Sequence, residues 1–193
     1  MRILIACEFS GIVREAFAAH GHDAWSCDLL PSDRAGTHIT GDVLEVLDQG
    51  WDLMIAHPPC THLAVSGAAW FARKQIEQAE ALAFVERLWA APIRQIALEN
   101  PVSVISTRSS LGKPTQIIQP WMFGHCERKT TCLWLKGLPR LIPISDLRAE
   151  TEARPKSQQN PLHYLGPSPD RWKLRSLTYE GIAHAMAAQW GGA

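Results

Sequence analysis

The sequence predicts an α/β protein built on a mostly parallel sheet with helices on both faces. Short apolar runs alternate with segments of helical spacing over the first hundred residues, and glycine, proline or an acidic residue ends most of the runs. This alternation is typical of βαβ units, in which each crossover helix covers one face of the sheet. The chain has 193 residues, 46% of them hydrophobic, which is enough for a sizeable core. We therefore expect residues 1–193 to form a single domain.

The first half of the chain contains the predicted parallel strands. Apolar runs favour strands over residues 2–7, 23–28, 38–41, 52–56 and 93–98. Helical spacing of apolar side chains predicts two helices, and these cover residues 10–20 and 68–91. We expect Ser10 to be the N-cap of the first helix and Gly21 to end it. Pro92 ends the second helix, which is rich in alanine.

The second half of the chain has a different texture. Residues 103–114 are polar and predict a loop, and residues 115–120 and 130–136 predict two further strands. Residues 137–175 contain several prolines and little periodicity, so we expect a loop-rich segment there. Helical spacing returns over residues 178–190 and predicts a final helix.

Composition excludes several classes of protein. The 20% of charged residues is ordinary for a soluble globular chain. No apolar stretch approaches the roughly 18 residues that span a bilayer, and the first apolar stretch is too short for a secretory leader. The chain has five cysteines, an odd number at irregular spacing, which argues against a disulfide framework and favours a reducing compartment. We therefore expect a cytoplasmic protein that binds no membrane.

The cysteines and histidines also raise the question of a metal site. A zinc site could be drawn from six side chains: His57, Cys60, His62, His125, Cys126 and Cys132. Their spacing contains no CxxC or HxxxH pattern, which is the usual signature of zinc ligands. The sequence therefore predicts no metal.

A net charge of zero hides an asymmetry along the chain. Residues 1–125 hold nine basic and thirteen acidic residues, whereas residues 126–193 hold ten basic and six acidic residues. A concentration of basic residues is typical of proteins that bind phosphate-bearing partners, although a solvated basic face has the same composition. Tyr164 and Trp172 lie within this part and could stack on bases.

The tripeptide Pro58-Pro59-Cys60 is the most informative motif. It follows the apolar run at residues 52–56, and the prolines end that strand because proline cannot donate to a sheet ladder. Cys60 is therefore expected at the carboxyl end of a strand, where open α/β sheets bind their ligands. The strand at residues 93–98 delivers Glu99-Asn100-Pro101 to the same edge. A nucleophile and an acid at one edge favour covalent chemistry on an electrophilic ring or carbonyl.

Each of these two residues also has a simpler interpretation. A cysteine is often a small buried hydrophobe, and Cys60 needs an activating neighbour, for which His57, His62 and the basic residues between Arg128 and Arg175 are candidates. Glu99 could be a carboxylate that a helix N-terminus stabilises. In the functional interpretation it donates a proton to a heterocycle nitrogen, and we expect its burial at a strand end to raise its pKa.

Three features of the first strands favour a nucleotide cofactor. Gly11 follows the first strand and allows backbone N–H groups to approach a ligand at the start of a helix, although a full GxGxxG is absent. Asp28 ends the second strand, where nucleotide-binding folds hold a ribose hydroxyl. Asp42 follows the third strand and could bind the amine of an adenine. Both acids could equally be ordinary surface residues of turns.

The ordered set of motifs resembles the cytosine-C5 DNA methyltransferases over most of the chain. The matching segments, in the order of that family, are Phe9-Ser10-Gly11-Ile12, Asp28, Gly41-Asp42-Val43, Pro59-Cys60, Glu99-Asn100-Pro101, residues 124–129 and residues 176–191. The pair formed by the proline-cysteine and Glu-Asn motifs is moderately specific, and the ordered whole is stronger than any single part.

The resemblance implies a Rossmann-like fold that uses S-adenosylmethionine to methylate C5 of cytosine in DNA. By this resemblance Cys60 is the nucleophile that adds to C6, Glu99 contacts the ring nitrogen and the amino group, and Arg128 stabilises the target site. The resemblance also implies a set of cofactor-binding residues: Phe9, Gly11, Asp28, Asp42 and Pro58.

The chain departs from the family pattern in three places. Val13 and Arg14 stand where the first motif usually continues with two glycines, so a modified and more acidic methyl donor is an alternative. Pro101 replaces a valine. The segment at residues 137–175 is too short for a full target-recognition domain and stands in its place, so a protein partner could supply the missing surface.

Four functions therefore stay open from the sequence. The first is cytosine-C5 methylation of DNA, which could be single-stranded. The second is a related pyrimidine methyltransferase that acts on RNA or a free nucleotide. The third is a catalytically silent protein that retains the fold and binds nucleic acid. The fourth, a cysteine hydrolase, would need a histidine paired with Cys60.

Overall fold

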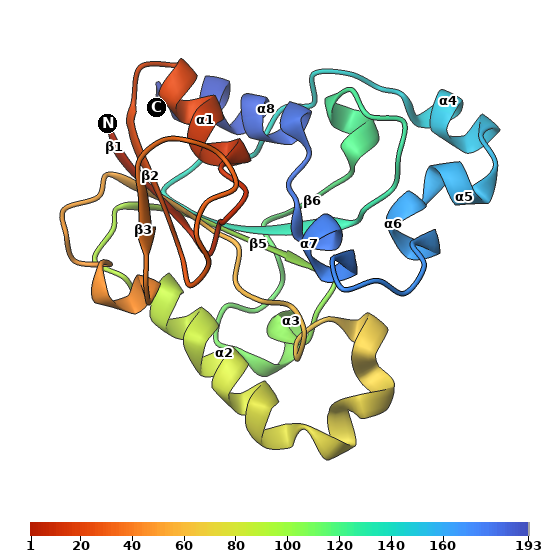
Figure 1. The fold of residues 1–193 in the computed structure, drawn as a ribbon, viewed down its shortest axis with the longest axis horizontal. Coiled ribbons are helices and arrows are strands. Elements are labelled where there is room, and N and C mark those ends of the chain that lie inside the picture. The colour runs from red at the N-terminus through yellow and green to blue at the C-terminus, as the bar shows by residue number, and fades with distance from the viewer. Residues whose placement is uncertain (193) are drawn as a thin grey trace.

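The computed structural model of the chain describes residues 1–192, and its centre is a seven-stranded sheet (Figure 1). The strands are β1 (Arg2–Ala6), β2 (Asp23–Asp28), β3 (His38–Thr40), β4 (Leu53–Ala56), β5 (Gln95–Pro101), β6 (Gln116–Ile118) and β7 (Thr131–Lys136). Their order in the sheet is β3-β2-β1-β4-β5-β7-β6. Strand β7 is antiparallel to both of its neighbours, and the other pairs are parallel. The sequence prediction of a mostly parallel α/β sheet is therefore confirmed.

Helices cover both faces of this sheet. On one face α1 (Ile12–Ala19) and α8 (Glu180–Trp190) lie side by side, and α2 (Gln75–Trp89) and the short α3 (Ile105–Arg108) lie on the other (Figure 1). The alternation of side chains along a strand explains the two layers, because successive residues point to opposite faces. In β1, Ile3 and Ile5 pack in the layer of α1 and α8, whereas Leu4 and Ala6 pack in the layer of α2.

The strand order places a topological switch point between β1 and β4. From β1 the chain builds outward through β2 and β3, and it then returns to the centre and builds in the other direction through β4 and β5. The loops that leave β1 and β4 therefore diverge at the carboxyl edge of the sheet. In open α/β sheets this switch point is where ligands bind.

The predicted helix over residues 68–91 is wrong in its first part. The chain forms a 3₁₀ helix, η2 (Val65–Arg73), and then α2, with a break at Lys74, where φ is −128° and ψ is 41°. No residue of η2 is buried, and although Phe71 packs partly against the core, the segment has less apolar contact with the sheet than α2, in which Val85 and Leu88 are buried.

The segment at residues 137–175 is more helical than predicted. It contains α4 (Arg148–Ala153), α5 (Lys156–Gln159) and α6 (Pro161–Tyr164), and most of α7 (Arg171–Ser176). Each of these helices has four to six residues, which is too short for an apolar stripe to show in the sequence. The strands predicted at residues 115–120 and 130–136 and the final helix are confirmed as β6, β7 and α8.

The N-cap of α1 is Gly11 and not Ser10. Gly11 adopts φ 74°, in the left-handed region that favours glycine. The carboxylate of Glu8 accepts hydrogen bonds from the backbone N–H groups of Val13 (2.7 Å) and Arg14 (3.3 Å) and so satisfies the first turn. The hydroxyl of Ser10 accepts from the N–H of Ile12 at 3.3 Å. A buried acid thus takes the role that we expected of a serine.

Arg14 is a structural residue. Its side chain is 1% exposed, and its guanidinium donates to two hydroxyls and two backbone carbonyls. These acceptors are Ser26 Oγ (2.9 Å), Ser32 Oγ (3.0 Å), Arg34 O (3.0 Å) and Ala35 O (2.8 Å). The guanidinium therefore fastens the loop that follows β2 to α1, and these four acceptors account for its position.

Replacement of Arg14 should destabilise the fold. We expect Arg14→Met to lower the free energy of unfolding by about 2–4 kcal/mol, because four acceptors lose their buried donor. Urea denaturation followed by circular dichroism measures this loss. The control is Arg87→Met, at an exposed position of α2, which should change stability by no more than about 0.5 kcal/mol. Equal stability of the two variants would show that the Arg14 bonds contribute nothing.

Over the described part of the chain, no helix combines the length and the apolar character that crossing a membrane requires.

Candidate active site

Register places the key residues of four strands in one row at the carboxyl edge. Ala6 of β1 pairs with Cys27 of β2 and with Ala56 of β4, and Ala56 pairs with Leu98 of β5. The residues that come next in each strand therefore lie side by side: Cys7, Asp28, His57 and Glu99. The sequence expectation that the motif after β4 and the acid of β5 share an edge is thus what the structure shows.

The loop that carries Cys60 is fixed on both sides. His57 donates its backbone N–H to the carbonyl of Ala6 at 2.9 Å, and the side chain of Asn100 donates to the carbonyl of Pro58 at 2.9 Å. After these anchors, the carbonyl of Cys60 closes a tight turn by accepting from the N–H groups of Leu63 and Ala64. Cys60 itself is exposed, so a ligand at this edge can reach its thiol.

Charges of both signs act on the Cys60 thiol. Its pKa is raised, first because neighbouring atoms remove water from it and then because the carboxylate of Glu99 repels the thiolate. Lys129 and Arg175 act in the opposite direction and stabilise the thiolate. The nucleophile predicted from the sequence therefore lies within electrostatic range of the predicted acid and of two cations.

Glu99 forms a close pair with His57. Nδ1 of His57 lies 3.1 Å from Oε2 of Glu99, and the two side chains are only 9% and 16% exposed. Burial acts to raise the pKa of Glu99, as expected, but the hydrogen bond and charge of His57 and the charge of Lys129 together leave the pKa below its usual range. The sequence prediction of a raised pKa is therefore wrong, because it did not include these two partners.

Lys129, and not Arg128, is the cation beside Glu99. Arg128 instead pairs with Glu152 of α4 at 2.9 Å. The ammonium of Lys129 donates to the carbonyl of Leu177 at 2.8 Å, and Lys129 and Glu99 line one small cavity next to α8. The sequence signal was the basic pair itself, which does not show which of its members faces the sheet.

The carboxyl ends of β1, β2 and β3 bring the predicted cofactor acids near each other. Burial raises the pKa of the Cys7 thiol, and the carboxylates of Asp28 and Asp42 raise it further, so both lie within electrostatic range of Cys7. Asp28 accepts from the N–H of Leu30 at 3.0 Å, and Asp42 caps the 3₁₀ helix η1 (Val43–Glu45) through the N–H of Leu44 at 2.9 Å. Each acid therefore has a local structural role and a further oxygen.

Phe9 packs against α7. It is 7% exposed, its ring centroid lies 5.8 Å from that of Trp172, and the ammonium of Lys173 lies 5.7 Å from the centre of the Phe9 ring. Helix α7 therefore packs over the loop that follows β1. Gly11, the other residue predicted in this loop, is explained by its positive φ and by Arg14, whose Nη2 would lie 2.6 Å from an added Cβ.

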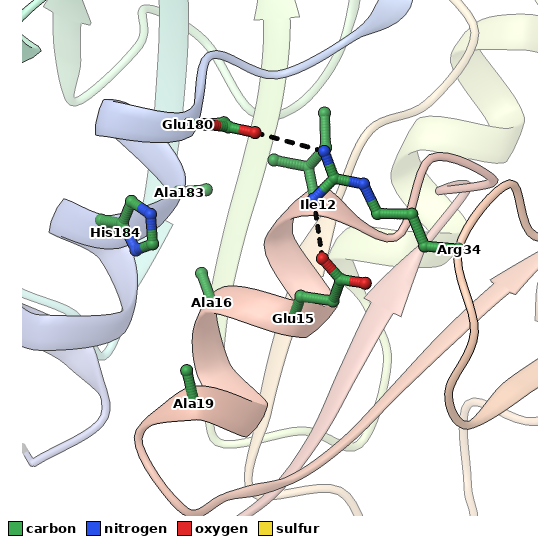
Figure 2. A pocket seen from close by; sticks show the side chains of 8 residues that line it. All are labelled: Ile12, Glu15, Ala16, Ala19, Arg34, Glu180, Ala183 and His184. Atoms are coloured by element: carbon green, nitrogen blue, oxygen red, sulfur yellow. Dashed lines mark hydrogen bonds and ion pairs between the residues drawn. The ribbon is translucent and has the colours of Figure 1, made fainter.

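A separate pocket of about 250 Å³ opens between α1 and α8 (Figure 2). Figure 2 shows Arg34 held between Glu15 of α1 and Glu180 of α8, with N–O distances of 2.7 and 3.2 Å. The small side chains of Ala16 and Ala183 line the space between the helices. Cys60 and Glu99 do not line this pocket, so its size says nothing about the site at the sheet edge.

Among residues 1–192, no group of three or more His, Cys, Asp and Glu side chains is arranged to hold a metal ion. The candidate zinc ligands include Cys132, which is buried in the layer of α2 on β7, whereas Cys60 is exposed.

The chain was compared with protein families, with curated proteins and with solved structures. No family model matches the chain, and no curated protein matches it. One similar solved structure is that of a proposed DNA modification methyltransferase encoded within a prophage of E. coli, at 14% identity and a TM-score of 0.47. The match covers 75% of this chain and 51% of that one, so the chain spans about half the length of this structure.

Proposed function

We propose that the protein is a methyltransferase that transfers a methyl group from S-adenosylmethionine to C5 of cytosine in DNA, through a covalent adduct of Cys60. The observation that carries the proposal is that Cys60, in the loop after β4, and Glu99, near the end of β5, belong to neighbouring parallel strands at the carboxyl edge, next to the switch point between β1 and β4. The order of the motifs along the chain, which resembles that of the cytosine-C5 family, supports the same conclusion.

The chemistry assigned to the chain's own residues is a conjugate addition. The thiolate of Cys60 attacks C6 of the pyrimidine and forms an S–C bond, while Glu99 gives its proton to N3. The electron pair of the C5–C6 double bond moves toward the ring nitrogen, and C5 becomes nucleophilic. After methylation, C5 loses its proton to a water molecule, the S–C bond breaks as the Cys60 thiolate departs, and N3 returns its proton to Glu99, which restores the aromatic ring and the starting form of the acid. Lys129 and Arg175 favour the thiolate that begins and ends this cycle.

The residues at the carboxyl edge fit S-adenosylmethionine. Asp28 and Asp42 offer carboxylate oxygens to ribose hydroxyls and to an amine, and Leu29 beside Asp28 is 75% exposed, which gives a purine an apolar surface to cover. Gly11 and Phe9 belong to the loop after β1, and Pro58 to the loop after β4, on either side of the switch point. When bound, this cofactor supplies an electrophilic methyl group. The strand order β3-β2-β1-β4-β5 supports a Rossmann-like methyltransferase fold.

Residues 148–176, the basic segment, are the proposed contact with DNA. Residues 148–176 lie along the carboxyl edge, because Arg128 binds Glu152 and Gln159 on one side and Phe9 meets Trp172 on the other. Tyr164 and Trp172 are 58% and 52% exposed and can stack on unpaired bases. A segment of short helices favours a single-stranded or flipped-out cytosine over the reading of a long duplex sequence. We propose that the chain is one catalytic domain in which residues 137–175, which include most of this segment, stand in place of a larger recognition domain.

Product analysis tests this proposal. The purified protein is incubated with S-adenosylmethionine carrying a labelled methyl group and, in parallel, with single-stranded DNA, duplex DNA, RNA or dCMP. The substrates are digested to nucleosides and identified by mass. We expect labelled 5-methylcytosine from DNA, with the highest yield from the single strand, and none from the Glu99→Ala variant.

The other outcomes of this experiment are informative. Label on RNA or on dCMP alone would replace DNA as the substrate, and label on an exocyclic nitrogen would contradict the C5 chemistry. If no product forms and calorimetry detects no binding of S-adenosylmethionine, the chain is a silent member of the fold.

A further inference from the structure

The motifs indicate His57 only as a candidate partner for Cys60, whereas in the structure His57 pairs with Glu99. His57 is the first residue after β4, and register sets it opposite Glu99 of β5. Its backbone N–H is bound to the carbonyl of Ala6, so the residue cannot shift along the strand. Within this frame Nδ1 of the ring reaches Oε2 of Glu99 at 3.1 Å. The histidine therefore contacts the acid and not the nucleophile.

The contact defines which atoms are used and which are free. A carboxylate only accepts hydrogen bonds, so the ring nitrogen that faces it, Nδ1, carries a proton. The other ring nitrogen, Nε2, is buried and has no hydrogen-bond partner among the described residues. With Oε2 held by His57, the remaining oxygen of Glu99 is the one that can meet a substrate. His57 thus gives the two carboxyl oxygens different roles.

We propose that His57 is a positioning residue for Glu99: its Nδ1–H holds Oε2, presents the other oxygen to the pyrimidine, and stabilises the carboxylate that forms when Glu99 gives up its proton. This inference rests on the proposed function. In the addition step the O–H bond of Glu99 breaks and an N3–H bond forms, while the thiolate supplies the electron pair. The negative charge moves from Cys60 to Glu99, where the donor of His57 receives it.

The neighbours of Glu99 determine how the pair responds to pH. The ionisable groups around it are His57 after β4, Cys60 in the next loop, Lys129 before β7, Cys132 in β7 and Tyr179 before α8. His57 and Lys129 favour the carboxylate, so the protonated acid is scarce in the free protein at neutral pH. Loss of the His57 donor should therefore make Glu99 easier to protonate and, at the same time, slow the addition.

Two variants of His57 separate the effect of the donor's position from the effect of losing the imidazole ring. In His57→Asn the side-chain nitrogen is bonded to Cγ, as Nδ1 is, so a donor stays where Oε2 needs it. In His57→Gln the nitrogen is one atom further out, near the place of Nε2. Both variants are polar and neutral, so a difference between them reports the position of the donor and not the loss of a ring.

The experiment has two readouts. The first is the titration of Glu99 in the full chain with ¹³C-labelled glutamate, followed by NMR and assigned by the signal that disappears in Glu99→Gln. We expect the midpoint to rise by about one pH unit in His57→Gln and to stay near that of the wild type in His57→Asn. The second readout is kcat for methylation, measured as a function of pH. We expect kcat to fall about tenfold in His57→Gln with KM unchanged, and most of this loss to be recovered in His57→Asn.

Equal Glu99 midpoints in the wild type and in His57→Gln would overturn the proposal, as would identical behaviour of the two variants. If the wild type methylates nothing, the proposed function fails, and the NMR titration still decides whether His57 controls Glu99. If His57→Gln does not fold, His57→Leu, which has comparable bulk and no donor, takes its place, and a Glu99 midpoint equal to that of the wild type would overturn the proposal.

Discussion

Cys60→Ser should abolish methylation, with a fall in rate of about three orders of magnitude or more. A serine hydroxyl is far less acidic than a thiol and a much poorer nucleophile toward C6, so the addition that activates C5 does not occur. The exposed position of Cys60 means that the change removes no core packing, and the fold should stay intact. The measurement is the release of labelled 5-methylcytosine from DNA at saturating S-adenosylmethionine.

A trapping experiment gives this prediction a second readout. In an oligonucleotide with 5-fluorocytosine the fluorine cannot leave as a proton does, so the S–C bond persists and the adduct survives denaturing electrophoresis. We expect an adduct with the wild type and with the matched control Cys126→Ser, a half-buried cysteine outside the proposed site, and none with Cys60→Ser. Methylation by Cys60→Ser at a normal rate would exclude the covalent mechanism.

The acidity of the two groups predicts how the rate depends on pH. Because the pKa of Cys60 is raised, only a small fraction of the thiol is ionised at neutral pH, and this fraction grows as pH increases. Because the pKa of Glu99 is lowered, only a small fraction of the carboxyl group is protonated at neutral pH, and this fraction falls as pH increases. The reactive form needs the thiolate and the protonated acid together, and it is therefore a minor form of the free protein.

Gly181→Ala should cause the largest loss of stability of any small substitution in α8. A Cβ at this position would lie 1.9 Å from the backbone carbonyl oxygen of Phe123, in the 3₁₀ helix η3 (Pro120–Phe123). The same residue donates its N–H to Nε2 of His125 at 3.0 Å. Because backbone cannot yield as a side chain can, α8 must move away from the turn, and we expect a loss of about 3–5 kcal/mol.

Thermal unfolding measures this loss. For a chain of this size the expected shift of Tm is about 10 °C, at 2–4 °C for each kcal/mol. The matched control is Gly166→Ala, at an exposed glycine whose Cβ would meet no atom within 4 Å, and it should unfold within about 2 °C of the wild type. A Gly181→Ala protein as stable as this control would show that α8 is not fixed against η3.

The sheet could be predicted from the sequence because its signal is local. Runs of four to seven residues, most of them ended by glycine, proline or an acidic residue, predicted all seven strands, including β6 and β7. The break at Lys74 could not be predicted, because residues 68–91 carry apolar side chains at helical spacing whether or not they lie against a core. Burial, and not spacing, decides where that helix begins.

The candidate site could likewise be predicted only in part. The positions of Cys60 and Glu99 follow from strand ends, and a strand end is visible in the sequence. The partners of Glu99 are not, because His57 and Lys129 meet it only through the register of β4, β5 and β7. The fate of Arg128 depends on Glu152, more than twenty residues further along the chain, and no local pattern contains that pairing.

The reversed direction of β7 has a consequence for how such a protein can change its target. Because β7 is antiparallel, it ends at Lys136, on the edge far from Cys60, and the chain must then cross back before α8. The stretch that crosses back is anchored at each end by elements of the core, so insertions or exchanges within it leave the sheet untouched. Residues 148–170 are in this sense a replaceable part, and they could be exchanged while α7, which carries Trp172 and Arg175, stays beside Phe9 and the Cys60 loop.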